Sequence, residues 1–251
     1  MKKSLLGCAI LAAVATAPAQ ADTLLGAYVG AQGWNMGVEG GFSSDASLTE
    51  FAYDDSTNSS LYVALEHPVP FVPNAKVART TLDTSGVTNL NAQFEFNGEL
   101  YSANTNVETE FEVTATDFIL YYEILDNDLV SIDVGINGKY IDGTIMVAES
   151  DGGNATTEDF SAVIPMAYAK AEVGLPFTGL GVYAEGSFLA IGDHSVSDLQ
   201  AALTYSFVES LALDMTIQAG YRVMNVEVED LDDLYANLDF TGAFIGLEFD
   251  F

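Results

Sequence analysis

The sequence predicts an all-β fold, an antiparallel transmembrane β-barrel of about ten strands, on three observations. Runs of alternating apolar and polar residues recur along the chain, and side chains in a strand point to opposite faces with period two. The connections between these runs alternate between long and short, as in outer-membrane barrels. Beyond the first twenty or so residues, no run approaches the roughly 18 uncharged apolar residues of a transmembrane helix. A barrel needs no such run, because its lipid face occupies alternate positions only.

The N-terminal segment predicts export. The chain begins with Met1-Lys2-Lys3, continues with an apolar run from Leu5 to Ala17, and then carries the small residues Ala19 and Ala21 around Gln20. This pattern is typical of a secretory signal peptide. We therefore expect residues 1–21 to be cleaved after export through the Sec route, leaving one barrel domain over residues 22–251. The only cysteine of the sequence lies in the leader, so no disulfide or thiol chemistry is expected in the mature chain.

The charge balance excludes one class of partner. The sequence has 37 acidic residues against 7 Lys and Arg, a formal net charge of −30. Loss of the two leader lysines makes the mature chain still more acidic. Nucleic acid is excluded as a partner because phosphate binding needs a basic surface. Such acidity indicates either a saline habitat or divalent cations held by acidic loops, and composition leaves both open.

The three C-terminal runs carry the clearest alternation. Phe251, Phe249 and Leu247 share one face of the last run with further apolar residues, while Asp250 and Glu248 lie on the other. The two preceding runs, Leu199–Phe207 and Leu211–Val223, alternate in the same way. Two different environments on the two faces are what a barrel wall requires.

Weaker alternation continues back to the N-terminus. The expected strands are Leu24–Trp34, Ser59–Glu66, Ala75–Asp83, Val107–Ile124, Leu129–Val147, Phe160–Leu175, Gly181–Ile191, Val196–Phe207, Leu211–Val228 and Leu238–Phe251. Eight strands is the alternative count, if Ala75–Asp83 and one neighbour lie outside the wall.

A periplasmic β-sandwich binding module would share the signal peptide and the alternation. It would not need apolar exteriors on nearly every strand or aromatic clusters at strand ends.

The aromatic clusters are expected at the two membrane interfaces, which aromatic side chains prefer. They are Tyr121, Tyr122, Tyr205, Phe207, Phe249 and Phe251 at the inner rim, and Phe160, Tyr235 and Phe240 at the outer rim.

A final strand that ends on Phe resembles the C-terminal signature of Gram-negative outer-membrane β-barrels. The resemblance implies that Phe251, Phe249 and Leu247 form the assembly signal read by the barrel-assembly machinery, after escort by periplasmic chaperones. It also implies an integral outer-membrane location with short periplasmic turns. The longer acidic loops would then be extracellular and would meet lipopolysaccharide and other outer-membrane lipid, with divalent cations between them.

A second resemblance rests on the segment Trp34–Gly41, which ends in Gly40-Gly41, and on Gly220-Tyr221-Arg222. The chain resembles a largely uncharacterised family of small outer-membrane proteins marked by that Gly-Gly pair. This family is distantly similar to the outer-membrane protein W family, whose eight-stranded barrels are implicated in uptake of small hydrophobic molecules. The resemblance implies a fold and a location, and the extra strands here separate the chain from the eight-stranded pattern.

All five basic residues after the leader fall inside expected strands. Parity places Lys139, Lys170 and Arg222 on the inward face. Lys76 and Arg79 have parity opposite to each other, so at most one of them points inward unless a bulge intervenes. Acidic residues available on the same inward face are Asp133, Glu172, Glu185, Asp198, Asp214 and Glu248. These charges predict either a structural ion-pair network that fills the lumen or a charge-selective constriction in a porin-like pore. We favour the network, since unpaired charges in a narrow lumen are costly.

Candidate chemistry is sparse. His194 lies in Gly192-Asp193-His194-Ser195, and a nearby Asp, His and Ser raise the alternative of an outer-membrane hydrolase resembling a protease or a lipid A deacylase. Adjacent residues on one turn usually point apart, however, whereas a triad is assembled across strands. His67 beside Pro68 in a short turn predicts no chemistry. We therefore expect no enzyme, no cofactor and no metal site, and a function in structure or in the passage or binding of small solutes.

Overall fold

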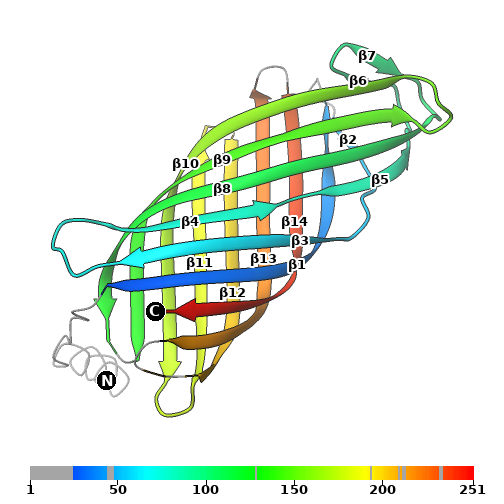
Figure 1. Ribbon diagram of the computed structural model, residues 1–251. Helices are drawn as coiled ribbons and strands as arrows, with labels where there is room; N and C mark the ends of the chain where they lie inside the picture. Colours follow the sequence, from blue (N-terminus) through cyan, green and yellow to red (C-terminus); the bar gives the residue numbers. More distant parts are fainter. Residues whose placement is uncertain are drawn as a thin grey trace, which may run out of the picture.

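Ten antiparallel strands close into a barrel (Figure 1). The computed structural model describes residues 25–43, 48–127, 129–192, 194–208, 210, 213–231 and 234–251. The expected signal peptide, its cleavage site, Asp193, Asp232 and Asp233 lie outside the described residues. The expectation of ten strands is confirmed, and the eight-strand count and the β-sandwich are wrong.

The wall follows the order of the chain and closes between its first and last strands. The wall strands are β1 (Gly26–Ser43), β3 (Ser56–Glu66), β4 (Asn74–Thr81), β8 (Asn106–Asp126), β9 (Val130–Glu149), β10 (Ala155–Leu175), β11 (Leu180–Ile191), β12 (His194–Val208), β13 (Asp214–Leu231) and β14 (Leu234–Asp250). The closing pair, β1 with β14, runs in register from Tyr28 opposite Asp250 to Ser43 opposite Tyr235. Closure removes the free edges that an open sheet would leave.

Short turns gather at one end of the barrel, together with the C-terminus (Figure 1). We call this the turn end, and it includes the connections 67–73 and 176–179. The opposite end, the loop end, carries the long connections. Two additional short strands lie there, β2 (Thr49–Glu50) beside β1 and β5 (Thr84–Asn89), which continues the pairing of β4 along β8.

The outer wall carries a belt of exposed apolar side chains near the turn end. On β8 the belt is Phe118, Leu120, Tyr122 and Ile124, each at least 44% exposed. Its other exposed members on the wall strands are Val29, Leu61, Val63, Leu65, Val77, Val134, Ile136, Tyr140, Val163, Val173, Leu175, Leu180, Val182, Phe188, Leu199, Leu203, Tyr205, Phe207, Ile217, Tyr221 and Ile245. An apolar band on alternate outward positions is the arrangement of a transmembrane barrel.

Toward the loop end the polarity of the wall inverts. On β8 the outward residues become Glu108, Glu110 and Glu112, while Val107 and Phe111 point inward and are buried. Water surrounds this part of the wall, so apolar side chains gain by turning inside. The inversion explains why the strands extend past the expected ends. Polar outward residues made the loop-end half of β1 and the first five residues of β10 resemble loops.

A hairpin of β6 (Phe94–Phe96) and β7 (Glu99–Tyr101) lies at the loop end within the segment expected as a loop (Figure 1). Its turn is Asn97-Gly98, where both residues have positive φ, +47° and +76°. Asn-Gly favours this two-residue hairpin turn because both residues tolerate the left-handed region. The base of the hairpin is fixed by two backbone hydrogen bonds between Leu90 and the segment Asn104-Thr105.

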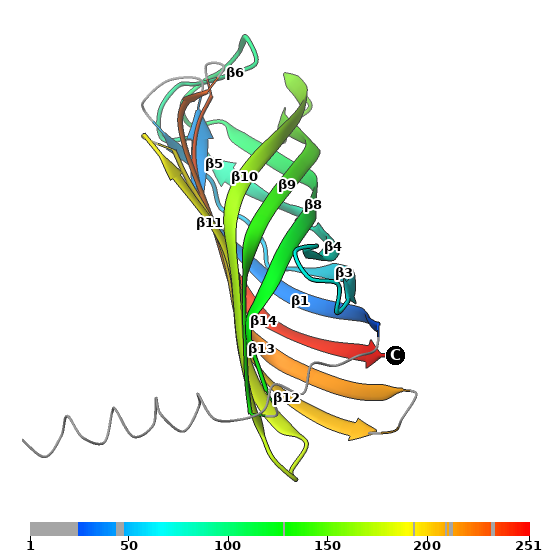
Figure 2. The same cartoon turned by 90° about the vertical axis from the view of Figure 1, so that its left-hand side faces the viewer.

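Strand β10 separates from β11 in the loop-end half (Figure 2). Pairing with β11 extends only from Leu175 to Ala167, whereas pairing with β9 continues to Ala155. Pro165 stands two residues beyond the last pair. Proline has no amide hydrogen to give a neighbouring strand and is found at sheet edges, which fits the point where the strands part.

The structure of the barrel explains why glycine occupies both positions of the Gly40-Gly41 pair. Gly40 has φ +114°, and a Cβ there would lie 2.0 Å from the carbonyl oxygen of Asn237 on β14. A Cβ on Gly41 would lie 1.9 Å from the carbonyl oxygen of Thr49 on β2. The pair lets β1 bend between two neighbouring strands where any side chain would collide with backbone.

Three of the aromatic residues expected at the interfaces point inside instead. Tyr121 and Phe240 are buried in the lumen, and Phe160 packs against the interior core. Tyr121 follows the inward parity of β8, and Phe160 and Phe240 lie in the part of the wall where polarity is inverted. Tyr122, Tyr205, Phe207 and Phe251 are exposed, as expected of rim residues.

Candidate functional site

The lumen has three levels between the turn end and the loop end. A polar cavity lies at the turn end, a network of charges fills the middle, and an apolar core closes the loop end. Each level is built from alternate residues of strands that lie far apart in the sequence.

The middle of the network centres on Asp198. The Nε and Nη2 atoms of Arg222 donate to its two carboxylate oxygens at 2.8 and 2.7 Å. The Nζ atom of Lys139 donates to Asp198 at 2.9 Å and reaches Asp117 at 2.7 Å. Lys139 is fully buried. Two cations therefore share two carboxylates, and the bidentate arginine contact gives the pairing a fixed geometry.

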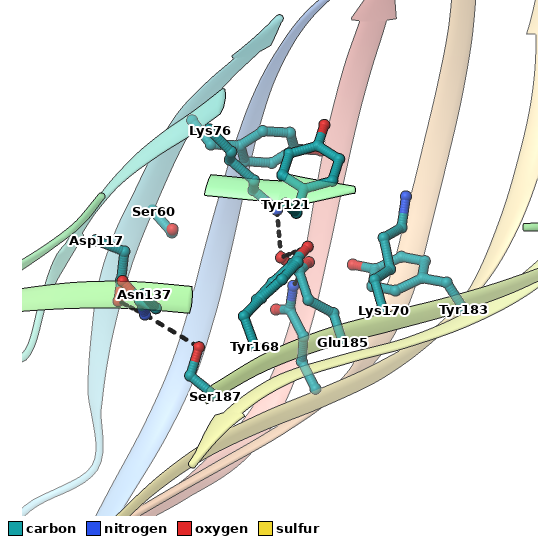
Figure 3. A network of polar contacts seen from close by, with 12 residues as sticks. Ser60, Lys76, Asp117, Tyr121, Asn137, Tyr168, Lys170, Tyr183, Glu185 and Ser187 are labelled. Atoms are coloured by element: carbon teal, nitrogen blue, oxygen red, sulfur yellow. Dashed lines mark hydrogen bonds and ion pairs between the residues drawn. The ribbon is translucent and has the colours of Figure 1, made fainter. Parts of the chain in front are cut away.

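Glu185 anchors the next layer, toward the turn end. Lys76 on β4 and Tyr168 on β10 both donate to it, and Figure 3 shows the two side chains meeting at its carboxylate. Gln200 donates to its other oxygen at 3.0 Å. The same figure shows Asn137 between Asp117 and Ser187, to which it donates. Strands on opposite sides of the barrel are thus tied across the lumen.

A chain of amides and phenols links the closing seam to the network. Gln32 on β1 donates to Gln218 on β13 at 3.1 Å, and Gln218 donates to the hydroxyl of Tyr62 at 3.1 Å. Tyr62 in turn donates to Glu248 on β14 at 2.6 Å. These contacts join four neighbouring strands, β13, β14, β1 and β3, around the closure of the barrel.

The charged residues predicted from sequence do not all enter one network. Lys139, Arg222 and Asp198 come together, and Lys170 pairs with Glu172 at 2.9 Å in a more exposed position. Glu185 pairs with Lys76. Among the described residues no ion pair reaches Asp133, Asp214 or Glu248, which line the turn-end cavity.

Sequence reasoning missed Asp117 and Asn137 and left Lys76 undecided. Asp117 lies on the inward face of β8 between Ala115 and Ile119, and apolar residues occupy both faces of that strand. Parity alone therefore could not single it out. Lys76 points inward, and Arg79 lies on the exposed outer face.

Cavities in the lumen narrow away from the turn end. The turn-end cavity has a volume of about 700 Å³ and includes Glu66, Glu123 and Lys170 in its lining. Beyond it lie cavities of about 70 and 50 Å³ beside Glu185 and Arg222. The smallest are large enough for water only.

The loop end is closed by an apolar core that we call the seal. Phe42 is at its centre, with the Phe51 ring stacked on it at 4.7 Å between centroids and the rings of Phe94, Phe96 and Phe111 edge-on at 5.4 to 5.7 Å. Other buried members include Trp34, Met36, Leu82, Leu90, Tyr101, Val107 and Val147. Tyr101 donates to the carbonyl oxygen of Val147 at 2.9 Å, which fastens the β6–β7 hairpin to the wall.

Replacing Phe94 with Ala should destabilise the seal. The ring is 2% exposed and contacts Phe42 and Phe51, and Phe→Ala in a packed core costs about 3–5 kcal/mol. Resistance of the loop end to added protease and the unfolding midpoint in detergent should both fall. Leu100→Ala in the same hairpin is the matched control, because Leu100 is 49% exposed. Equal behaviour of the two variants would contradict a packed seal.

His67 contributes contacts of a structural kind. In the turn 67–73, the amide of Val69 donates to Nδ1 of His67 at 3.2 Å, and Asn74 accepts from the His67 amide. His194 and Ser195 are consecutive residues of β12, so their side chains point to opposite faces. Asp193 lies outside the described residues. Of the three groups of the hydrolase alternative, the two that the structure describes therefore point apart along the strand.

No group of three or more His, Cys, Asp or Glu side chains among the described residues could hold a metal ion. No helix in the described part of the chain is long and apolar enough to cross a membrane.

Comparisons with known proteins give structural likeness only. No protein-family model matches the chain, and no curated protein matches it in sequence. Among solved structures, the transport unit of the autotransporter AIDA-I from Escherichia coli is 8% identical, with 97% of this chain and 96% of that one covered and a TM-score of 0.40. A FadL homologue from Pseudomonas aeruginosa is 9% identical, with 90% of each chain covered and a TM-score of 0.32. The toluene transporter TodX from Pseudomonas putida is 7% identical, with 95% and 93% covered and a TM-score of 0.30.

Proposed function

We propose that the protein is an integral outer-membrane β-barrel with a structural role, whose lumen is sealed against solutes. The observation that carries the proposal is the seal. Its buried aromatic core spans the loop end of the lumen, above a middle level in which Lys139 and Arg222 are held by carboxylates. Side chains can fill the interior of a small barrel, and here only cavities of about 70 and 50 Å³ lie beyond the turn-end cavity, beside Glu185 and Arg222.

The membrane location is supported by the apolar belt on the outer wall. So many exposed apolar side chains are more than a soluble surface usually carries in one contiguous patch, and they face outward on alternate positions as lipid requires. The turn end would face the periplasm and the loop end the outside. The acidic outer face of β8 would then lie above the outer leaflet, where divalent cations can link carboxylates to lipopolysaccharide. Barrel-assembly machinery and periplasmic chaperones complete the proposed partners.

Electrical recording tests the sealed lumen. We expect the purified protein, reconstituted in planar bilayers, to give no stable conductance steps. We also expect no swelling of liposomes in small sugars. A porin reconstituted in parallel is the positive control for both measurements. Stable steps, or swelling that scales with protein, would contradict the sealed barrel.

Fractionation tests the location separately: soluble protein after lysis, without a heat-modifiable gel shift, would contradict the membrane assignment.

The second candidate is passage of small solutes through the charge-lined lumen. It is favoured by the row of cavities that narrows from the turn end toward the middle. Passage would require the β6–β7 hairpin to leave the seal. Replacing residues 91–104 with a short Gly-Ser link should then produce conductance, whereas the structural proposal expects the remaining aromatic core and ion pairs to keep the lumen closed.

A further inference from the structure

Arg79 differs from every other basic residue that the structure describes. Lys76, Lys139, Lys170 and Arg222 point into the lumen and pair with carboxylates. Arg79 lies on the opposite face of β4 and is exposed on the outer wall, because its neighbours Ala78 and Thr80 line a lumen cavity. No ion pair to Arg79 occurs among the described residues. A lone cation on the exterior of so acidic a chain calls for a partner outside the chain.

The height of Arg79 on the wall is well defined. It lies opposite Leu61 on β3 and opposite Thr116 on β8. Toward the turn end the outward residues beside it are apolar, with Val77 45% and Phe118 54% exposed. Toward the loop end they are hydroxyl-bearing, with Ser59 and Thr81 joined by a hydrogen bond of 3.0 Å between the Ser59 amide and Thr81 Oγ1. Arg79 thus marks the loop-end boundary of the apolar belt.

On β3, β4 and β8, carboxylates begin further toward the loop end. Glu112 is the first on β8, four residues from Thr116, which is about 13 Å along a strand. The wall around β3, β4 and β8 therefore has three successive zones: apolar residues, a guanidinium among hydroxyls, and carboxylates. A charge in the apolar zone would be destabilising, whereas a charge near the boundary costs little.

We propose that Arg79 binds a phosphate group of the outer-leaflet glycolipid, lipopolysaccharide. This inference rests on the proposed outer-membrane location. Acyl chains of such a lipid would lie against Leu61, Val77 and Phe118, and its phosphate would meet the guanidinium and the hydroxyls of Thr116 and Thr81. Arginine suits this ligand because its planar fork donates to two phosphate oxygens at once. Divalent cations bound by the carboxylates nearer the loop end would also bind the outer sugars and phosphates of the same lipid.

Lipid that remains bound during purification tests the site. Wild-type protein, Arg79→Gln and Arg79→Lys would be extracted from outer membranes in mild detergent. Lipopolysaccharide per barrel would then be counted by native mass spectrometry. We expect about a tenfold weaker retention in Arg79→Gln, which corresponds to about 1.4 kcal/mol, and intermediate retention in Arg79→Lys. The double variant Arg79→Gln/Thr116→Arg moves the charge to the next strand at the same height and should restore retention.

A second measurement separates lipid from free phosphate. Barrels refolded in phosphatidylcholine vesicles would receive lipopolysaccharide, its dephosphorylated form or inorganic phosphate, and the midpoint of the heat-modifiable gel shift would be recorded. Only phosphorylated lipopolysaccharide should raise the wild-type midpoint, and it should raise that of Arg79→Gln less. Equal retention and equal midpoints for wild type and Arg79→Gln would overturn the inference while leaving the barrel intact. Absence of wild-type protein from the outer membrane would instead overturn the proposed function.

Discussion

Replacing Asp198 with Asn should strongly destabilise the barrel. Asp198 accepts both donors of the Arg222 fork and one from Lys139. The amide keeps the shape of the side chain and removes its charge, which leaves two buried cations to share Asp117. Breaking a buried pair by removing one partner typically costs about 3–5 kcal/mol. The unfolding midpoint in urea, followed by tryptophan fluorescence and by the gel shift, should fall accordingly.

The matched control is Glu172→Gln, which removes the same charge from the Lys170 pair. The side chains of Lys170 and Glu172 are 30% and 39% exposed, and ion pairs reached by water contribute only about 0–1 kcal/mol. The midpoint of Glu172→Gln should therefore stay close to wild type. If the unfolding midpoints of both variants fall by the same small amount, water reaches Asp198 more readily than its burial implies.

The wall of the barrel could be predicted from sequence because its lipid-facing residues are apolar at alternate positions. The last three strands show this most clearly, since Leu203, Tyr221 and Ile245 are all exposed and their neighbours in sequence are not. Parts of the loop-end half could not be predicted in the same way. There the apolar residues turn inward and the outward residues are polar, so residues 35–43 of β1, residues 155–159 of β10 and the β6–β7 hairpin were expected as loops.

The charged site could be predicted only where strand parity was unambiguous. Lys139, Arg222 and Asp198 lie on strands whose outward faces are apolar, so their inward placement followed directly. Asp117 lies on a strand that is apolar on both faces, and its meeting with Lys139 depends on the register between β8 and β9. Arg79 is the exception to the inward placement of basic residues. A basic residue in a strand can point outward when it lies at the edge of the apolar belt.

Deleting Phe251 should reduce assembly in the outer membrane far more than it reduces stability. The Phe251 amide donates to the carbonyl oxygen of Ala27 at 3.0 Å, and the Ala27 amide donates back at 3.3 Å. Its ring is 59% exposed. Two hydrogen bonds at the end of a seam contribute about 0.5–1.5 kcal/mol each, and the register from Tyr28 opposite Asp250 to the far end of β1 remains. Protein refolded in detergent should therefore be nearly as stable as wild type.

The effect in cells should be larger because the final strand resembles the signal read by the barrel-assembly machinery. At low expression, the Phe251 deletion or a charged C-terminal extension should lower the outer-membrane amount several-fold and leave protein in the periplasm. Phe207→Ala is the control, since Phe207 is also an exposed aromatic of the belt near the turn end, 43% exposed on β12, but does not end the chain. If Phe207→Ala and the Phe251 deletion reach the outer membrane in equal amounts to wild type, the terminal ring acts only as an interface residue. A signal requires the ring at the last position only. An equal loss of outer-membrane protein in both variants would therefore indicate a general need for aromatic residues at the rim.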